Sequence, residues 1–284
     1  MASRASPVIA GALDRSWLAA AAVNLLLVNA LAPMAFQDIG QRGLALSAAN
    51  MGGISIVFVL AGYAIWSIAE RGGASPLKRF DWLVASLAIA AALIPLHLAA
   101  KAALLPVSAY FLLTAARDEP AYRIGFIGLA LTGAFIWGAI LLNAFAGPIL
   151  RLDAGLVELA TGIRIEGNIL HIDPRESGVG FDKIVIMGGC SSLRNVSQAL
   201  ILWAALVQLF AARVTPAIVA AGAAAVAAMI ALNVARIALI VAYPQHLAFI
   251  HDGLGATIIS LLAFVTAFAI IGMTIVAQQK RLDI

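Results

Sequence analysis

Cys190 is the only cysteine of the 284-residue chain, and it stands where a polar segment meets a long apolar run. Gly188 and Gly189 precede it, so the backbone can turn sharply there. Ser191 and Ser192 follow, and their hydroxyl groups suit the start of a helix. At a helix N-terminus the positive end of the dipole favours the thiolate, the nucleophilic form of cysteine. The alternative is a buried cysteine that acts as a small hydrophobic residue.

Two further residues have the chemistry that a cysteine nucleophile requires. His251 can carry a proton between the thiol and a leaving amine, and its expected place at a helix N-terminus favours the neutral imidazole. Arg236 lies in an apolar segment, where a guanidinium costs on the order of 3 kcal/mol. It can stabilise the oxyanion of an attacked carbonyl, together with backbone N–H groups near Cys190. Taken singly, Arg236 could instead extend to the membrane surface, and His251 could be an ordinary interfacial histidine.

Polar neighbours support or compete with these residues. Arg194 lies one helical turn beyond Cys190, so it either competes with Arg236 for the oxyanion or binds an anionic group of a substrate. Asp252 either caps the helix that it begins or orients the His251 ring, and capping is the favoured role.

Two asparagines and a second histidine complete the set. Asn195 and Asn233 are expected to form interhelical hydrogen bonds, and Asn233 could also orient Arg236. His246 is a rival to His251 for proton transfer, although it lies in a loop.

The composition places this chemistry in a membrane. The sequence is 63% hydrophobic and 11% charged, with a mean hydropathy of +1.01, which a soluble domain of this size could not bury. The net charge of +4 comes from scattered basic residues and indicates no nucleic-acid partner. One cysteine excludes an internal disulfide and a CxxC site, and His97 and His171 have no partner at metal-ligand spacing. We therefore predict no metal ion and no other cofactor.

About eight apolar runs are long enough to cross a bilayer, which takes about 20 residues per helix. They are Trp17–Phe36, Met51–Ala69, Trp82–Leu98, Ala100–Ala116, Tyr122–Asn143, Ser191–Ala212, Thr215–Tyr243 and Asp252–Ala277. Prolines at 95 and 106 interrupt the third and fourth runs, which are either two short helices or one kinked pair that does not fully cross. The predicted fold class is an all-α polytopic membrane protein.

The connection 144–189 is the one sizeable soluble segment, and it is expected outside the membrane. Apolar residues recur at helical spacing over 149–160, a helix that could lie flat on the membrane surface. Alternating residues over 163–166 and 169–172, with a Gly-Asn turn between them, predict a small hairpin. Residues 181–187 add a third strand that leads to the cysteine. The chain thus divides into a five-helix part (1–143), this external segment (144–189) and a catalytic three-helix part (190–284).

Basic residues in short loops predict the orientation. With the N-terminus in the cytoplasm and eight crossings, the cytoplasmic side carries Arg4, Arg15, Arg71, Lys78, Arg79, Arg117, Arg123, Arg213, Lys280 and Arg281. The opposite short loops carry only Arg42 and Lys101. Both termini are then cytoplasmic, and Cys190, Arg236 and His251 fall at similar depth near the external face.

These residues resemble the exosortase/archaeosortase family of membrane transpeptidases. The likeness lies in Cys190-Ser191-Ser192 entering a membrane helix, in Asn233-x-x-Arg236 near the end of the next, and in a His-Asp-Gly sequence from His251 that opens the last. It covers roughly residues 162–277. The family usually has glycine two residues after the cysteine, where this chain has Ser192.

The resemblance implies that Cys190 is the nucleophile, Arg236 the oxyanion or thiolate stabiliser and His251 the acid/base. The implied partners are exported proteins with a C-terminal sorting tail, made of a short motif, a membrane helix and a basic end. Cleavage would occur at the external, periplasmic face of a bacterial plasma (inner) membrane, and a thioester would pass the acyl group to a lipid, an amine or water. Two alternatives stay open: a binding or transport protein in which Arg236 and Arg194 hold an anionic ligand or lipid, and a membrane scaffold without chemistry.

Overall fold

Helices dominate the chain, as the composition predicts. The computed structural model describes residues 14–44, 47, 54–73, 75–94, 97–172 and 182–282. Its α-helices are α1 (Arg15–Arg42), α3 (Ile56–Arg71), α4 (Asp81–Leu93), α5 (His97–Thr114), α6 (Pro120–Thr132), α7 (Gly138–Thr161), α9 (Ser192–Leu209), α10 (Pro216–Ala242), α11 (Leu247–His251) and α12 (Leu254–Leu282). A π-helical turn, η2 (Gly133–Trp137), joins α6 to α7, and 3₁₀ turns η3 (Gly188–Cys190) and η4 (Pro244–His246) precede α9 and α11. Arg4, Met51, Pro95 and Phe181 lie outside the described residues.

Four helical segments of the described chain are long and apolar enough to cross a membrane. They are Arg15–Gln41, Pro120–Thr161, Pro216–Ala242 and Leu254–Arg281. The other helices are shorter; α4 has 13 residues and α3 has 16. At 1.5 Å per residue, α4 extends about 20 Å, less than the roughly 30 Å hydrocarbon core of a bilayer. The structure thus has the character of a membrane protein, with separate short helices α4 and α5 where the sequence left two alternatives.

Polar residues at the helix starts explain where several helices begin. Asp14 caps α1 by accepting a hydrogen bond from the N–H of Trp17, and Ser55 caps α3 in the same way. Thr215 caps α10, and Pro216 occupies the first helical position, where no N–H is needed. These local features set the helix starts close to the predicted ones.

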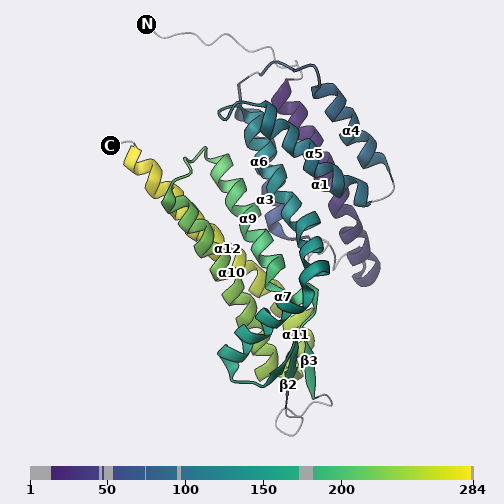
Figure 1. Cartoon of the computed structure of the whole chain (residues 1–284), viewed down its shortest axis with the longest axis vertical. Helices are drawn as coiled ribbons and strands as arrows, with labels where there is room; N and C mark the ends of the chain where they lie inside the picture. Colours follow the sequence, from purple (N-terminus) through teal and green to yellow (C-terminus); the bar gives the residue numbers. More distant parts are fainter. Residues whose placement is uncertain are drawn as a thin grey trace.

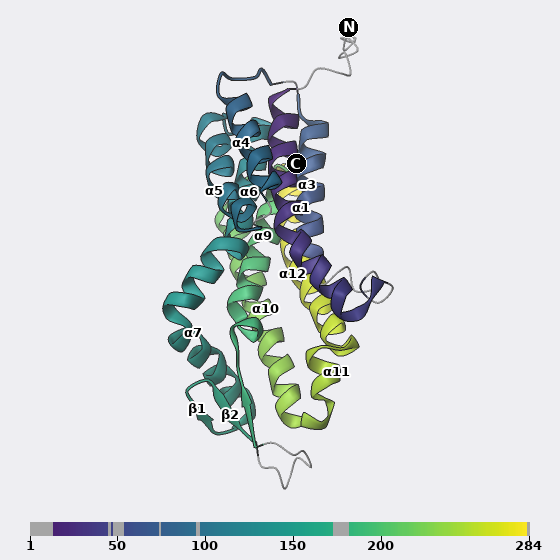
Figure 2. The same ribbon diagram turned by 90° about the vertical axis from the view of Figure 1, so that its right-hand side faces the viewer.

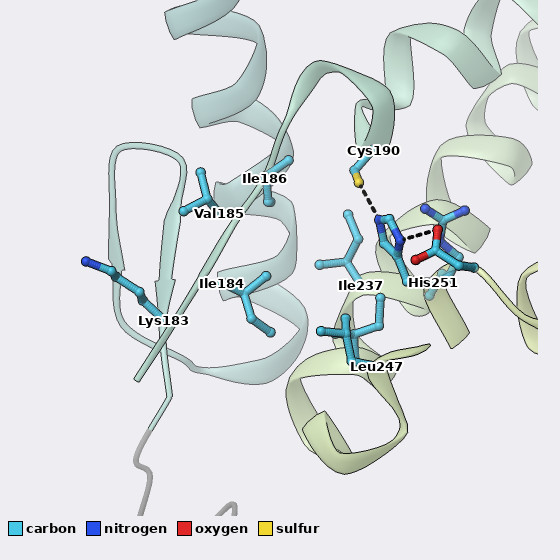
Figure 3. A pocket seen from close by; sticks show the side chains of 11 residues that line it. Lys183, Ile184, Val185, Ile186, Cys190, Ile237, Leu247 and His251 are labelled. Carbon is cyan, nitrogen blue, oxygen red and sulfur yellow. Dashed lines mark hydrogen bonds and ion pairs between the residues drawn. The ribbon is translucent and has the colours of Figure 1, made fainter. Parts of the chain in front are cut away.

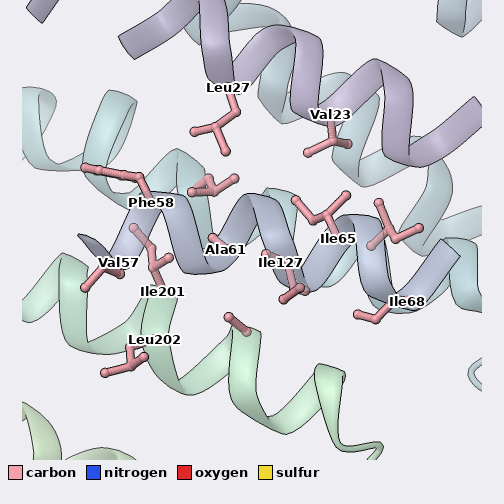
Figure 4. Close-up of a cluster of buried hydrophobic side chains, with 14 of the residues drawn as sticks. Val23, Leu27, Val57, Phe58, Ala61, Ile65, Ile68, Ile127, Ile201 and Leu202 are labelled. Atoms are coloured by element: carbon pink, nitrogen blue, oxygen red, sulfur yellow. The ribbon is translucent and has the colours of Figure 1, made fainter. Parts of the chain in front are cut away.

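The main core lies where α3 packs between α1 and α9 (Figure 4). Val23 of α1 lies over Ile65 of α3, and Leu27 lies over the part of α3 near Ala61. Ile201 of α9 packs on the opposite side of α3, and all of these side chains have almost no exposed surface. Close packing also depends on Gly125 of α6, where an added Cβ would lie 2.8 Å from backbone atoms of α5. This bundle is the rigid support for the C-terminal half.

A three-stranded antiparallel sheet confirms the predicted hairpin and third strand. Its strands are β1 (Ile165–Glu166), β2 (Ile169–His171) and β3 (Lys183–Val185), in the order β1-β2-β3. Gly167 takes a positive φ of 65° in the turn between β1 and β2. The sheet packs on α7 and α10 through a second core of Ala154, Val157, Leu170, Ile186 and Ile237.

The predicted end of the fifth span at Asn143 lies two residues before a break in α7. The helix is kinked at Phe145, whose φ and ψ are −132° and 30°, and helical structure then continues to Thr161. Pro148 explains the kink, since proline has no N–H for the preceding turn and its ring crowds the carbonyl there. The predicted helix over 149–160 is therefore the part of α7 that follows this kink.

Arg15 is not a loop residue, as the orientation pattern assumed, but a fully buried one. Its guanidinium pairs with Asp81 at 3.2 Å and with Glu119 at 3.1 Å. It also donates to the carbonyl of Thr114. The charge therefore ties α1 to α4 and to the α5–α6 connection, because a buried guanidinium needs paired carboxylates.

The long axis of the molecule separates two different ends. The start of α1 and the end of α12 lie toward one end, whereas the sheet lies at the other, beside α7, the end of α10 and α11 (Figures 1 and 2). This second end contains Cys190, Arg236 and His251.

Candidate active site

The Cys190 turn is the last part of the chain before α9. Cys190 closes the 3₁₀ turn η3, and Ser191 is the N-cap of α9, accepting a hydrogen bond from the N–H of Leu193 at 3.2 Å. The predicted capping serine is confirmed. Cys190 lies two positions before Ser192, the first residue of α9, so the thiol is at the N-terminus of this helix, as predicted. A 3₁₀ turn forms because the N–H of Ser191 bonds back to the carbonyl of Gly188.

The thiol lies against the imidazole of a distant residue. Cys190 Sγ is 3.1 Å from His251 Nε2, and His251 Nδ1 is 2.9 Å from Asp252 Oδ1 (Figure 3). The cysteine is half-buried. The thiol contacts the imidazole, and the imidazole contacts the carboxylate. This is the geometry of a nucleophile, a proton carrier that activates it, and a carboxylate that orients the proton carrier.

His251 reaches this position from the end of one helix, not from the start of the next as predicted. It is the last residue of the one-turn helix α11, and α12 begins only at Leu254. Gly253 makes the break possible, since an added Cβ there would lie 2.9 Å from the carbonyl oxygen of Phe249. Asp252 contacts the His251 ring, as expected of a residue that orients the imidazole, the role that we considered less favoured than helix capping.

Two residues from other helices hold the Cys190 turn in place. Asn233 of α10 donates from Nδ2 to the carbonyl of Cys190 at 2.9 Å and lies 3.3 Å from Ser192 Oγ. This confirms the predicted interhelical hydrogen bond. Asp153 of α7 accepts from the N–H of Ser192 at 3.1 Å and is only 3% exposed. Its carboxylate therefore sits at the N-terminus of α9, where the helix dipole favours negative charge.

Asp153 was missed by the sequence analysis. It falls in the stretch 149–160, where it has the spacing of a solvent-facing residue on an amphipathic helix. Its burial follows from the packing of α7 on the second core, beside Ala154 and Val157, which the sequence alone does not reveal.

The backbone near the thiol is already occupied by hydrogen bonds. The N–H of Cys190 bonds to Met187, that of Ser191 to Gly188, and that of Ser192 to Asp153. These three groups are thus not free donors, against the expectation that N–H groups near the cysteine share the oxyanion. Arg236, by contrast, lines the same cavity as the thiol, where its guanidinium can donate to a developing negative charge.

Two cavities share Arg236, His251 and Asp252 as lining residues. The first, of about 320 Å³, is mostly apolar and is lined by Cys190, Arg236 and His251 together with residues of β3 and α11. The second, of about 430 Å³, lies between the start of α3, α9, α10 and α12 and is more polar. Arg194 and Asn195 line this second cavity, which Arg236, His251 and Asp252 also reach.

The two arginines that competed for the oxyanion role differ in the cavities that they line. Arg236 lines both cavities and shares the first with the thiol, whereas Arg194 lines only the second. Arg194 and Arg236 are close enough for their positive charges to repel each other. Of the two, only Arg236 therefore borders the space that contains the sulfur.

The remaining histidines stand apart from this site. His246 is exposed and lines neither cavity, which removes it as a rival to His251. His171 lies in β2, 3.6 Å from Glu166. Among the residues that the structure describes, no group of three or more His, Cys, Asp or Glu side chains is arranged to hold a metal ion.

Comparisons with protein-family models, with curated proteins and with solved structures find no match for this chain. The function is therefore inferred from the site itself.

Proposed function

We propose that the protein is a membrane-embedded cysteine peptidase or transpeptidase of exosortase type. The observation that carries this proposal is the 3.1 Å contact between Cys190 Sγ and His251 Nε2, with Asp252 on the far ring nitrogen. A structural cysteine has no need of an oriented imidazole, whereas a nucleophile requires one. Arg236, which lines the same cavity as Cys190, supplies the third function that acyl transfer needs, a donor for the oxyanion.

The reaction proceeds in two acyl transfers. His251 Nε2 takes the thiol proton, and the Cys190 sulfur attacks the carbonyl carbon of the scissile peptide bond. The carbonyl electron pair moves to oxygen, where Arg236 donates a hydrogen bond. As the oxyanion collapses, the C–N bond breaks and the amine leaves with the proton from His251. The acceptor, a lipid, an amine or water, then attacks the thioester, and its proton passes through His251 to the departing sulfur.

The proposed setting is the external face of a bacterial plasma membrane. About eight crossings and cytoplasmic termini would place the Cys190 end outside, by the distribution of basic residues. The proposed partners are exported proteins with a C-terminal tail of a short motif, a membrane helix and a basic end, as the family resemblance implies. Supporting this, the sheet, the cysteine turn and α11 gather at the end away from the start of α1 (Figure 1).

Alkylation of the thiol tests the proposal without a known substrate. We expect iodoacetamide to modify Cys190 at neutral pH, and His251→Ala to slow the reaction at least about tenfold, because the imidazole no longer takes the thiol proton. His246→Ala is the matched control and should leave the rate unchanged, since His246 lines neither cavity. A thiol that is inert, or equally reactive in both variants, would refute the enzyme. Cys190→Ala should also abolish cleavage of a co-expressed tail-bearing protein while folded protein persists.

A second function is favoured by one observation, the pair of arginines at the 430 Å³ cavity. A binding or transport protein would use Arg194 and Arg236 to hold an anionic solute or lipid head group. It predicts the opposite pattern in mutants: Cys190→Ala retains function, whereas Arg194→Ala and Arg236→Ala each remove it.

A further inference from the structure

Among the residues that the structure describes, strand β3 has one edge without a partner strand. In the order β1-β2-β3 it pairs with β2 alone. Ile186 donates to the carbonyl of Asn168 and Ile172 donates to that of Asp182, so the even-numbered residues of this strand bond to β2. In an antiparallel ladder the alternate residues direct their N–H and C=O groups the other way. The backbone groups of Lys183 and Val185 therefore point to the free edge.

That free edge faces the cavity that contains the thiol. The 320 Å³ cavity is lined by four consecutive residues of this segment, Lys183 to Ile186, and also by Cys190 and His251. Successive side chains of a strand leave on opposite faces, so a space that touches four in a row touches the edge of the strand. Figure 3 shows the strand running toward the cysteine turn, with Ile184 on the side of Ile237 and Leu247.

We propose that the edge of β3 is the docking strand for the acyl-donor substrate, which binds as an extended peptide and adds a fourth strand to the sheet. This inference rests on the proposed peptidase function and names how that site holds its substrate. An extended peptide is the occupant that fits, because it supplies alternating main-chain donors and acceptors to Lys183 and Val185. Its continuation along the cavity brings a peptide carbonyl to the sulfur, since Cys190 lines the same cavity.

The other wall of the cavity defines the preferred side chain. Ile184 of β3 is opposed by Ile237 and Ile240 of α10 and by Leu247 of α11. An apolar side chain of the bound peptide buries surface against these residues, whereas a charged one would lose its hydration there. The substrate class is therefore an extended segment with an apolar residue close to the scissile bond.

Peptide electrophiles test the pairing with the protein unchanged. The probe is acetyl-Ala-Val-Leu chloromethyl ketone, compared with two versions that carry an N-methyl group on either the Val or the Leu amide. Only one of these amides can face β3 in a strand, so methylation of that one should slow labelling of Cys190 on the order of tenfold, and methylation of the other should not. Equal rates for all three peptides, or an equal loss for both methylated ones, would overturn the docking strand.

A pair of variants at Val185 tests whether the peptide binds at the outer edge of β3. Val185→Pro removes an outward N–H without breaking a bond to β2, so it should slow labelling by the parent peptide on the order of tenfold, because a carbonyl of the peptide loses its donor. Val185→Ala keeps the N–H and should label at close to the wild-type rate. Equal rates of labelling in Val185→Pro and Val185→Ala would count against the proposal.

Iodoacetamide separates this inference from the function on which it rests. If iodoacetamide labels Cys190 in a His251-dependent way but the peptides show no amide preference, the docking strand is wrong and the peptidase stands. If Cys190 reacts with neither reagent, the peptidase itself fails.

Discussion

The reactivity of Cys190 depends on a ring that another residue orients. Asp252 accepts at 2.9 Å from His251 Nδ1, which leaves Nε2 directed at the sulfur. The carboxylate is mostly exposed, so water can replace part of its effect. At this scale Asp252 is a positioning residue, because it acts on the thiol only through the imidazole.

We predict that Asp252→Asn slows iodoacetamide labelling of Cys190 roughly tenfold, because an asparagine amide can hold the His251 ring in the tautomer that does not accept the thiol proton. The loss should be smaller than for a buried triad carboxylate, because water competes for the ring at this exposed position. The rate constant of alkylation, compared with that of His251→Ala, measures this effect. Asp182→Asn changes an exposed acid of the same region and serves as the control. An Asp252→Asn rate equal to the wild-type rate would show that the pair is incidental.

At the scale of elements, the start of α9 is the junction of three helices. Asp153 reaches it from α7 and Asn233 from α10, and both bond to the backbone or side chains of the Cys190–Ser192 segment. The position of the nucleophile is therefore decided by how α7 and α10 pack, and the second core holds them together.

Asp153→Ala should destabilise this junction by about 1–3 kcal/mol, since it leaves the buried N–H of Ser192 without an acceptor. Thermal unfolding of the purified protein in detergent should show a lower Tm, and Cys190 labelling should slow in parallel. Glu158→Ala removes an exposed acid from the same helix and should change neither quantity. Equal Tm values for the two variants would contradict the anchoring role of Asp153.

At the scale of the whole molecule, the basic residues of the short loops and the candidate active site lie at opposite ends. The proposed orientation sends the end with the sheet outward, because the basic loops collect at the other end. Arg15 does not contribute to this distribution as a free charge, since it is buried between carboxylates.

Single cysteines in a Cys190→Ala background test the orientation. Glu158→Cys, on the exposed end of α7, should react with a membrane-impermeant maleimide in intact cells. Arg79→Cys, exposed before α4, should react only after the membrane is opened. The reverse pattern, or equal labelling of both, would place the site on the cytoplasmic side.

Local signals in the sequence were sufficient for much of this description. The membrane class follows from composition, because no soluble core could bury so many apolar residues. Ser191 is recognisable as a helix cap, and the hairpin around Gly167 follows from alternation and turn chemistry, since both depend on a few adjacent residues. The grouping of Cys190, Arg236 and His251 required only the order of the helices.

Tertiary contacts decided the rest. The burial of Arg15 and the anchoring role of Asp153 each depend on partners that adjacent residues do not reveal. The same holds for the 3.1 Å distance between Cys190 and His251, which stand 61 positions apart. A sequence can place a thiol and an imidazole near one membrane face, but only the packing of α7, α10 and α11 brings their atoms into contact.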